Sequence, residues 1–141
     1  MEVDWELEDW LLDAGEQAER KVIAGHSLTP GERLIREFWV FDVHTRNGGV
    51  SQYFLNHGAV QWQTLRSAWL PDRVPSLGPI IAKVERVIAS AADPYLATLD
   101  ASPEIEEFYE AHQVGVRREL RGLTPEAEQG AAADGGRGPV L

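Results

Sequence analysis

Apolar residues that recur every three or four positions are the feature of this sequence that most constrains its fold. In the first segment they form one face of a helix: Val3, Leu7, Trp10, Leu11, Ala14 and Ala18. No segment shows the alternation of apolar and polar residues that a half-buried strand requires. A length of 141 residues suits one domain. We therefore predict an all-α chain, a single compact multi-helix domain of about five to seven helices.

Local capping signals place the ends of the first two helices. Residues 29–32 read Thr-Pro-Gly-Glu, which supplies an N-cap threonine, a proline in the first turn and the glutamate of a capping box. We expect a helix from about Val3 to Ala24 that stops at Gly25, a residue type typical of helix C-termini. The second helix should run from this capping box to Gly48-Gly49, because paired glycines end a helix.

Further helices are expected over residues 51–55 and 59–70, and from Ser76 as a cap to about Ala91. Asp93-Pro94 marks a break or a new cap, and Ser102-Pro103-Glu104 predicts the start of a last helix that ends near Gly122. Residues 1–121 should form the domain, with an acidic N-terminal helix in 1–25. Residues 122–141 are rich in Gly and Ala and lack aromatics, so we predict a flexible C-terminal tail.

Charge is strongly segregated along the chain. The 23 acidic and 13 basic residues give a formal net charge of −10. Residues 1–19 and residues 93–110 are rich in Asp and Glu and contain no Lys or Arg, and they flank a mildly basic middle. Such a chain is repelled by nucleic acid and by anionic lipid, so we expect no direct nucleic-acid or membrane partner and an attraction to basic proteins.

Five acidic side chains of the first helix recur at helical spacing, roughly opposite its apolar face: Glu2, Glu6, Asp9, Asp13 and Glu16. Like charges at these spacings repel one another, so local stability does not favour the stripe. It is either a solvated face or a surface for a partner. Three acidic residues of the second segment are candidates for another patch: Asp100, Glu104 and Glu107. Trp5 and Leu12 lie off the apolar face, where they could contact a neighbouring chain.

Residue types that carry enzyme chemistry are sparse. The absence of cysteine excludes thiol catalysis, disulfides and thiolate metal sites. His26, His44, His57 and His112 lack metal-ligand spacing. The nearby Asp42, His44 and Ser51 invite comparison with a catalytic triad, but triads are recognised by geometry and not by spacing. We expect no catalytic residue, no metal and no cofactor. The N-terminus lacks a signal peptide and no apolar stretch is long enough to span a membrane, so a cytoplasmic protein is expected.

Residues 46–58 carry the most distinctive motif of the chain. Asn47 can end a helix, and the following glycines permit a sharp turn with close packing. Gln52 and Asn56 are four residues apart and share a helix face, while Tyr53 and Phe54 supply buried area. The motif is either a structural corner between helices or a functional pocket lined by its three amide side chains.

This segment resembles a bacterial family of small acidic proteins, long catalogued as a domain of unknown function, that includes a DNA-mimic protein. The residues that carry the resemblance are Asn47, Gly48, Gly49, Gln52, Tyr53, Phe54, Asn56 and Gly58. The likeness extends over about residues 28–110, from the capping box to the aromatic pair Phe108-Tyr109. It implies an all-helical fold, a homodimer, and carboxylates that bind a DNA-binding regulator in place of phosphates.

Three functions remain open at this point. The first is a DNA-mimic-like inhibitor or regulator of a basic, DNA-binding protein. The second is an immunity or antitoxin-like protein that neutralises one toxin or nuclease, for which an apolar hot spot such as Trp5 or Trp10 is needed. The third is a structural adaptor domain whose acids serve solubility.

Overall fold

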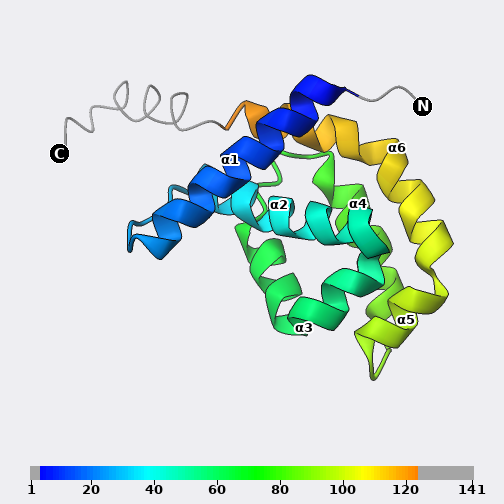
Figure 1. Cartoon of the computed structure of the whole chain (residues 1–141). Helices are drawn as coiled ribbons and strands as arrows, with labels where there is room; N and C mark the ends of the chain where they lie inside the picture. Colours follow the sequence, from blue (N-terminus) through cyan, green and yellow to red (C-terminus); the bar gives the residue numbers. More distant parts are fainter. Residues whose placement is uncertain (1–3, 124–141) are drawn as a thin grey trace.

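The structure is a computed structural model in which residues 4–123 are described. They form six α-helices and no strand: α1 (Trp5–Ile23), α2 (Pro30–Gly48), α3 (Val50–Ala68), α4 (Leu77–Ile88), α5 (Pro94–Asp100) and α6 (Ser102–Arg121). The helices pack around one hydrophobic core (Figure 1). The prediction of an all-α, single-domain fold is therefore confirmed.

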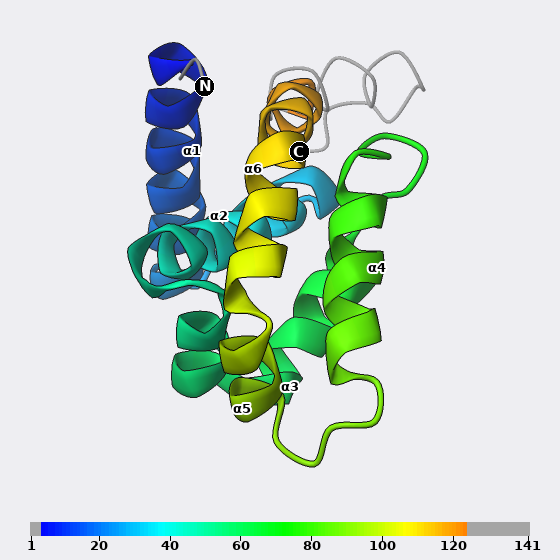
Figure 2. The same ribbon diagram turned by 90° about the vertical axis from the view of Figure 1, so that its right-hand side faces the viewer.

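Helix α2 is the centre of the arrangement and contacts α1, α3 and α6. Figure 2 shows α6 lying between α1 and α4, with both of which it is in contact. The short α5 packs beneath, against α3 and α4. As a result α6, which begins in one acidic segment of the sequence, is brought beside α1, which carries the other.

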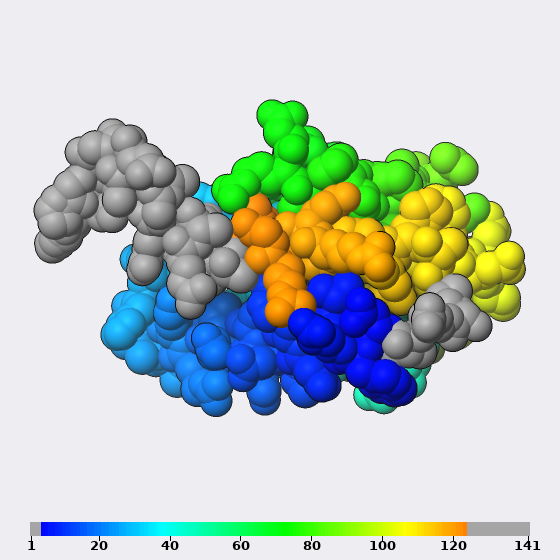
Figure 3. Space-filling view, turned by 90° about the horizontal axis from the view of Figure 1, so that it is seen from above, coloured from blue at the N-terminus to red at the C-terminus, as the bar shows by residue number. Residues whose placement is uncertain are grey.

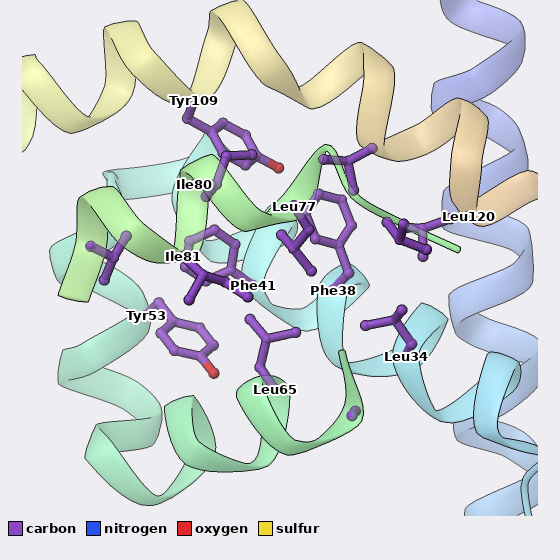
Figure 4. Close-up of a cluster of buried hydrophobic side chains, with 14 of the residues drawn as sticks. Leu34, Phe38, Phe41, Tyr53, Leu65, Leu77, Ile80, Ile81, Tyr109 and Leu120 are labelled. Atoms are coloured by element: carbon purple, nitrogen blue, oxygen red, sulfur yellow. The ribbon is translucent and has the colours of Figure 1, made fainter. Parts of the chain in front are cut away.

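Aromatic side chains fill the core where α2, α3 and α6 meet (Figure 4). The ring of Phe41 lies 5.0 Å from that of Tyr53 and 5.8 Å from that of Tyr109, measured between centroids. Both contacts are edge-to-face, the geometry that aromatic quadrupoles favour. Aliphatic residues of α4 close the core from the other side, among them Leu77, Ile80 and Ile81.

The capping signals of α1 and α2 act as predicted. Thr29 Oγ1 accepts the backbone N–H of Glu32 at 3.1 Å, and a Glu32 carboxylate oxygen accepts the N–H of Thr29 at 2.9 Å. Gly25 follows α1 with a φ of +82°, which L side chains rarely adopt. The two helical pieces expected between residues 51 and 70 are present as α3, which is kinked at Gly58, where φ is +75°.

One predicted side-chain cap is wrong, although Ser76 does occupy the N-cap position of α4. The Ser76 side chain does not cap α4; its N–H and Oγ instead donate to the carboxylate of Glu119 on α6. The last helix begins at Ser102, as predicted, and the Ser102 hydroxyl donates to Glu106. The predicted cap at Asp93 is confirmed, since its carboxylate accepts the N–H of Tyr95 at 3.0 Å.

The C-terminal end of the core reaches beyond α6. Leu123 is buried and belongs to the main hydrophobic cluster, although it falls in the predicted tail. The remainder of that tail, residues 124–141, lies outside the described residues. Among residues 4–123, no helix combines the length and apolar character that crossing a membrane requires.

Candidate functional site: an acidic hollow between α1, α2 and α6

The acidic stripe of α1 points away from the core. Glu6, Asp9, Asp13 and Glu16 are all exposed, whereas the opposite face buries Leu7, Leu11 and Ala18. Glu2 lies outside the described residues. The predicted opposition of an apolar and an acidic face is confirmed for the four residues that the structure describes.

Most of the stripe lacks a cationic neighbour. Glu6 pairs with Arg121 of α6 at 3.0 Å, at the crossing where Figure 3 shows the first turns of α1 against the C-terminal part of α6. Asp13 accepts a hydrogen bond from Gln17 at 2.9 Å. Within residues 4–123, Asp9, Asp13 and Glu16 form no ion pair. Their charge is therefore available to a partner.

The predicted second patch is exposed, and one of its three members is paired with α4. Asp100 ends α5, and Glu104 and Glu107 stand on the first turns of α6. Glu104 pairs with Lys83 of α4, and this ammonium lowers the pKa of the Glu104 carboxyl. The ion pair directs Glu104 toward α4, so it is not part of the surface that α1 forms.

Other acids of the same two segments do come together. A hollow of about 450 Å³ opens between the start of α1, the end of α2 and the first half of α6. Its lining consists of Trp5, Glu8, Thr45, Arg46, Glu106, Tyr109 and Glu110. The two acidic segments, separate in the sequence, therefore meet at this hollow. Trp5 stands at it with 69% of its surface exposed, and among the large apolar side chains of residues 4–123 only Ile23 and Val60 are more exposed.

A buried charge network lies behind the hollow. Asp42 of α2 accepts hydrogen bonds from the Tyr109 hydroxyl and from Arg117 Nη2, the latter at 2.7 Å. Burial raises the pKa of Asp42, and the Arg117 guanidinium opposes this rise. Burial also raises the pKa of Tyr109 well above its ordinary value, so the phenol stays protonated and remains a donor. The network fixes α6 against α2 from inside.

Arg46 links this network to the hollow. Its Nε lies 3.9 Å from Asp42 Oδ1, and its guanidinium forms an ion pair with Glu8 of α1. Burial lowers the pKa of Arg46, but from so high a reference value that the side chain stays a cation at neutral pH. Arg46 thereby holds the start of α1 beside α2, and neutralises one of the three glutamates at the hollow.

The glycine-rich motif is the corner that joins α2 to α3. Gly49 has a φ of +85°, and a Cβ atom there would lie 2.9 Å from Ser102 Oγ. Tyr53 and Phe54 are buried, as predicted. Asn47 is exposed, Gln52 is partly buried, and neither they nor Asn56 line the hollow. The motif thus positions α6 against the end of α2, and its amides stand apart from the acidic site.

Two histidines form a pair on the surface beside this corner. His44 Nε2 of α2 lies 2.9 Å from His57 Nε2 of α3, and His44 Nδ1 lies 3.2 Å from the Asn56 amide nitrogen. Burial and the neighbouring His57 lower the pKa of His44. Among the described residues, no three His, Asp or Glu side chains gather in a way that could hold a metal ion. Asp42, meanwhile, is bound to Arg117 rather than to His44.

Comparison of the chain with protein-family models, with curated proteins and with solved structures finds no match. The resemblance to the family of small acidic proteins therefore stays a prediction, made from the motif residues alone.

The hollow contains residues that the sequence did not single out. Glu8, Glu106 and Glu110 were counted in the acidic segments but not among the candidate binding residues. One signal was present: Glu106 and Glu110 are four apart on one helix, as a pair of carboxylates on a common face must be. The spacing of these two glutamates along α6 does not show which neighbouring helix they face.

Proposed function

We propose that this chain is a non-enzymatic acidic binding protein that occupies the DNA-contacting surface of a basic, DNA-binding regulator, in the manner of a DNA mimic. The observation that carries the proposal is the row of exposed carboxylates without ion pairs on α1, Asp9, Asp13 and Glu16, on the same helix whose first turn also lines the acidic hollow. Carboxylates held on a rigid helix can engage the Lys and Arg side chains that otherwise contact phosphates.

The electrostatic basis of this function fixes its salt dependence. The carboxylates of α1 are exposed, so their attraction to a partner is screened over about 8–10 Å at ordinary ionic strength. Duplex DNA and this protein would compete for one basic surface. Binding should therefore weaken both with salt and with added duplex.

The test is capture of the regulator from host lysate, its purification, and titration against two variants of equal charge. Replacement of Asp9→Asn, Asp13→Asn and Glu16→Gln removes three charges from α1. The control adds three positive charges to the exposed side of α3, by Ala59→Lys, Gln63→Lys and Ser67→Lys. Since an exposed ion pair contributes about 0.2–1 kcal/mol, the loss of three should weaken binding at least about threefold.

The control should change the affinity much less, because its charges lie away from α1. If both variants bound the regulator equally weakly, net charge alone would explain the loss of affinity, and the proposed surface on α1 would be contradicted. Retention of full affinity by the α1 variant, or a complex indifferent to duplex DNA, would reject the DNA-mimic proposal.

A second candidate function is favoured by the exposure of Trp5. An immunity or antitoxin-like protein needs an apolar anchor at the centre of its interface. Trp5 is 69% exposed and Leu12 is 50% exposed, and both line a second depression between α1 and α2. Trp10, by contrast, packs against the core, so its substitution would disturb the fold. In the same titration, a larger loss from Trp5→Ala than from the three charge changes would favour this function.

A further inference from the structure

We propose that the hollow holds an arginine side chain of the basic partner, stacked on Trp5 and bound by Glu106 and Glu110. This inference deepens the proposed function and rests on it. The hollow's volume of about 450 Å³ falls in the usual range of small-ligand sites, about 300–1,000 Å³. It is therefore large enough to take a side chain.

The charge of the hollow selects a cation. Three glutamates and one arginine line it, and Glu8 is already paired with Arg46. Glu106 and Glu110 form no ion pair within residues 4–123; Glu106 accepts a hydrogen bond from Ser102. Arg46, on the same hollow, is close enough for Glu110 to raise its pKa, but both carboxylates are left without a direct ion pair, which an incoming positive side chain would supply.

The geometry favours guanidinium over ammonium. Glu106 and Glu110 are one helical turn apart on α6, a separation of about 5–6 Å between Cβ atoms. A planar guanidinium carries donors on several edges and can engage both carboxylates while its face stacks on an indole, which a compact ammonium cannot do. Trp5 supplies that indole from the opposite wall, on α1.

A buried hydroxyl is a second and independent sign of an incomplete site. Thr45 lines the hollow and is 4% exposed, yet its Oγ1 has no hydrogen-bond partner among the described residues. Buried polar atoms are almost always satisfied, since leaving one unpaired costs about 1–3 kcal/mol. A guanidinium N–H that reached the base of the hollow could donate to this hydroxyl.

The experiment uses the full chain and a short peptide with blocked ends that contains one arginine among glycine and serine residues. Two control peptides carry lysine or citrulline in place of the arginine. Citrulline has the shape of arginine without its charge. The reporter is the indole N–H of Trp5 in a proton–nitrogen NMR spectrum, assigned by its loss in Trp5→Phe. We expect the arginine peptide to shift this signal, the lysine peptide to bind more weakly, and the citrulline peptide to leave it unmoved.

Two double variants with the same charge change locate the site. The double variant Glu106→Gln with Glu110→Gln should bind the arginine peptide about fivefold to tenfold more weakly. Asp100→Asn with Glu107→Gln removes two exposed charges from the same region outside the hollow, and should change the affinity less than about twofold. Equal losses in both double variants, or no shift of the Trp5 signal by any peptide, would overturn the assignment.

The outcome separates this inference from the function on which it rests. If the regulator binds the Glu106→Gln, Glu110→Gln variant as tightly as the original chain while the α1 variant fails, the arginine site is wrong and the proposed function stands. If the arginine peptide binds the hollow but the captured partner is indifferent to the α1 charges and to DNA, the proposed function fails and the site remains.

Discussion

Arg117 is the residue on which the charged part of the interior depends. It is 1% exposed, and its guanidinium lies 2.7 Å from the carboxylate of Asp42, which is itself buried. A buried ion pair adds little net stability over an apolar pair of equal shape, but breaking it leaves a charge without a partner in a poorly solvated place. The pair therefore matters most when one member is removed.

Replacement of Arg117→Met should destabilise the fold by about 3–5 kcal/mol at neutral pH, measured by urea unfolding. The loss should also depend on pH. Burial raises the folded-state pKa of Asp42, and without Arg117 this rise is larger. A group with a raised folded pKa gives stability that is present below its unfolded pKa and lost as the pH rises through the folded pKa.

The deficit of the variant should consequently shrink as the pH falls through the ordinary Asp pKa of about 3.9 toward about 3, where Asp42 is mostly protonated in both states. Arg118→Met is the matched control, because Arg118 is the next residue and is exposed. It should leave stability within about 0.5 kcal/mol. A deficit from Arg117→Met that is independent of pH would mean that lost packing, and not the unpaired charge of Asp42, is the cause.

Helix α1 can lie against α2 because it has a glycine at the point of contact. A Cβ atom on Gly15 would lie 2.2 Å from Cγ of the Trp39 ring, far inside contact distance. Trp39 therefore occupies the space that any larger residue at position 15 would need. This close approach sets the position of α1, and with it the position of the acidic stripe.

The substitution Gly15→Ala has two opposing effects on the free energy of unfolding. Alanine is favoured over glycine inside a helix by about 1 kcal/mol, whereas overpacking a filled contact costs about 1–3 kcal/mol. Because the clash involves a large ring, we expect a net loss of about 1–2 kcal/mol in thermal or urea unfolding. In a Trp39→Leu background the same substitution should cost less, since the ring is absent. A stabilised Gly15→Ala protein would show that α1 shifts freely on α2.

At the scale of the whole molecule, unpaired negative charge is concentrated on two helices that are in contact, α1 and α6. The unpaired carboxylates of α1 and those of the hollow lie on neighbouring helices, and the formal net charge of the chain is −10. Concentrated like charge opposes the compact state through self-repulsion. A partner of opposite charge, or screening by salt, would relieve it.

Salt should accordingly act with opposite sign on the fold and on the complex. Raising the ionic strength from about 0.02 to about 0.5 M should raise the unfolding temperature of the free protein, because repulsion among the carboxylates is screened. The same change should weaken binding of the regulator. The variant with Asp9→Asn, Asp13→Asn and Glu16→Gln should show a smaller rise in unfolding temperature. A melting temperature that falls with salt would indicate that ion pairs outweigh repulsion.

Features set by neighbouring residues could be predicted from the sequence. The capping box of Thr29 and Glu32, the end of α1 at Gly25 and the exposed acidic stripe all follow from contacts within a turn or two of helix. The side-chain cap at Ser76 failed for the converse reason. Glu119 reaches Ser76 from α6, 43 residues away in sequence, and offers a charged acceptor that competes with the local cap.

The sequence by itself determined that this chain is helical, where its first helices begin and end, and that its acids are segregated in two segments. Only the tertiary structure decided that Glu8, Glu106 and Glu110 meet at one hollow while Glu104 turns to Lys83. Periodicity fixes the angle of a side chain about its own helix axis. Which neighbour that side chain faces depends on how the helices pack, and here the close contacts of Gly15, Gly49 and Arg117 settle it.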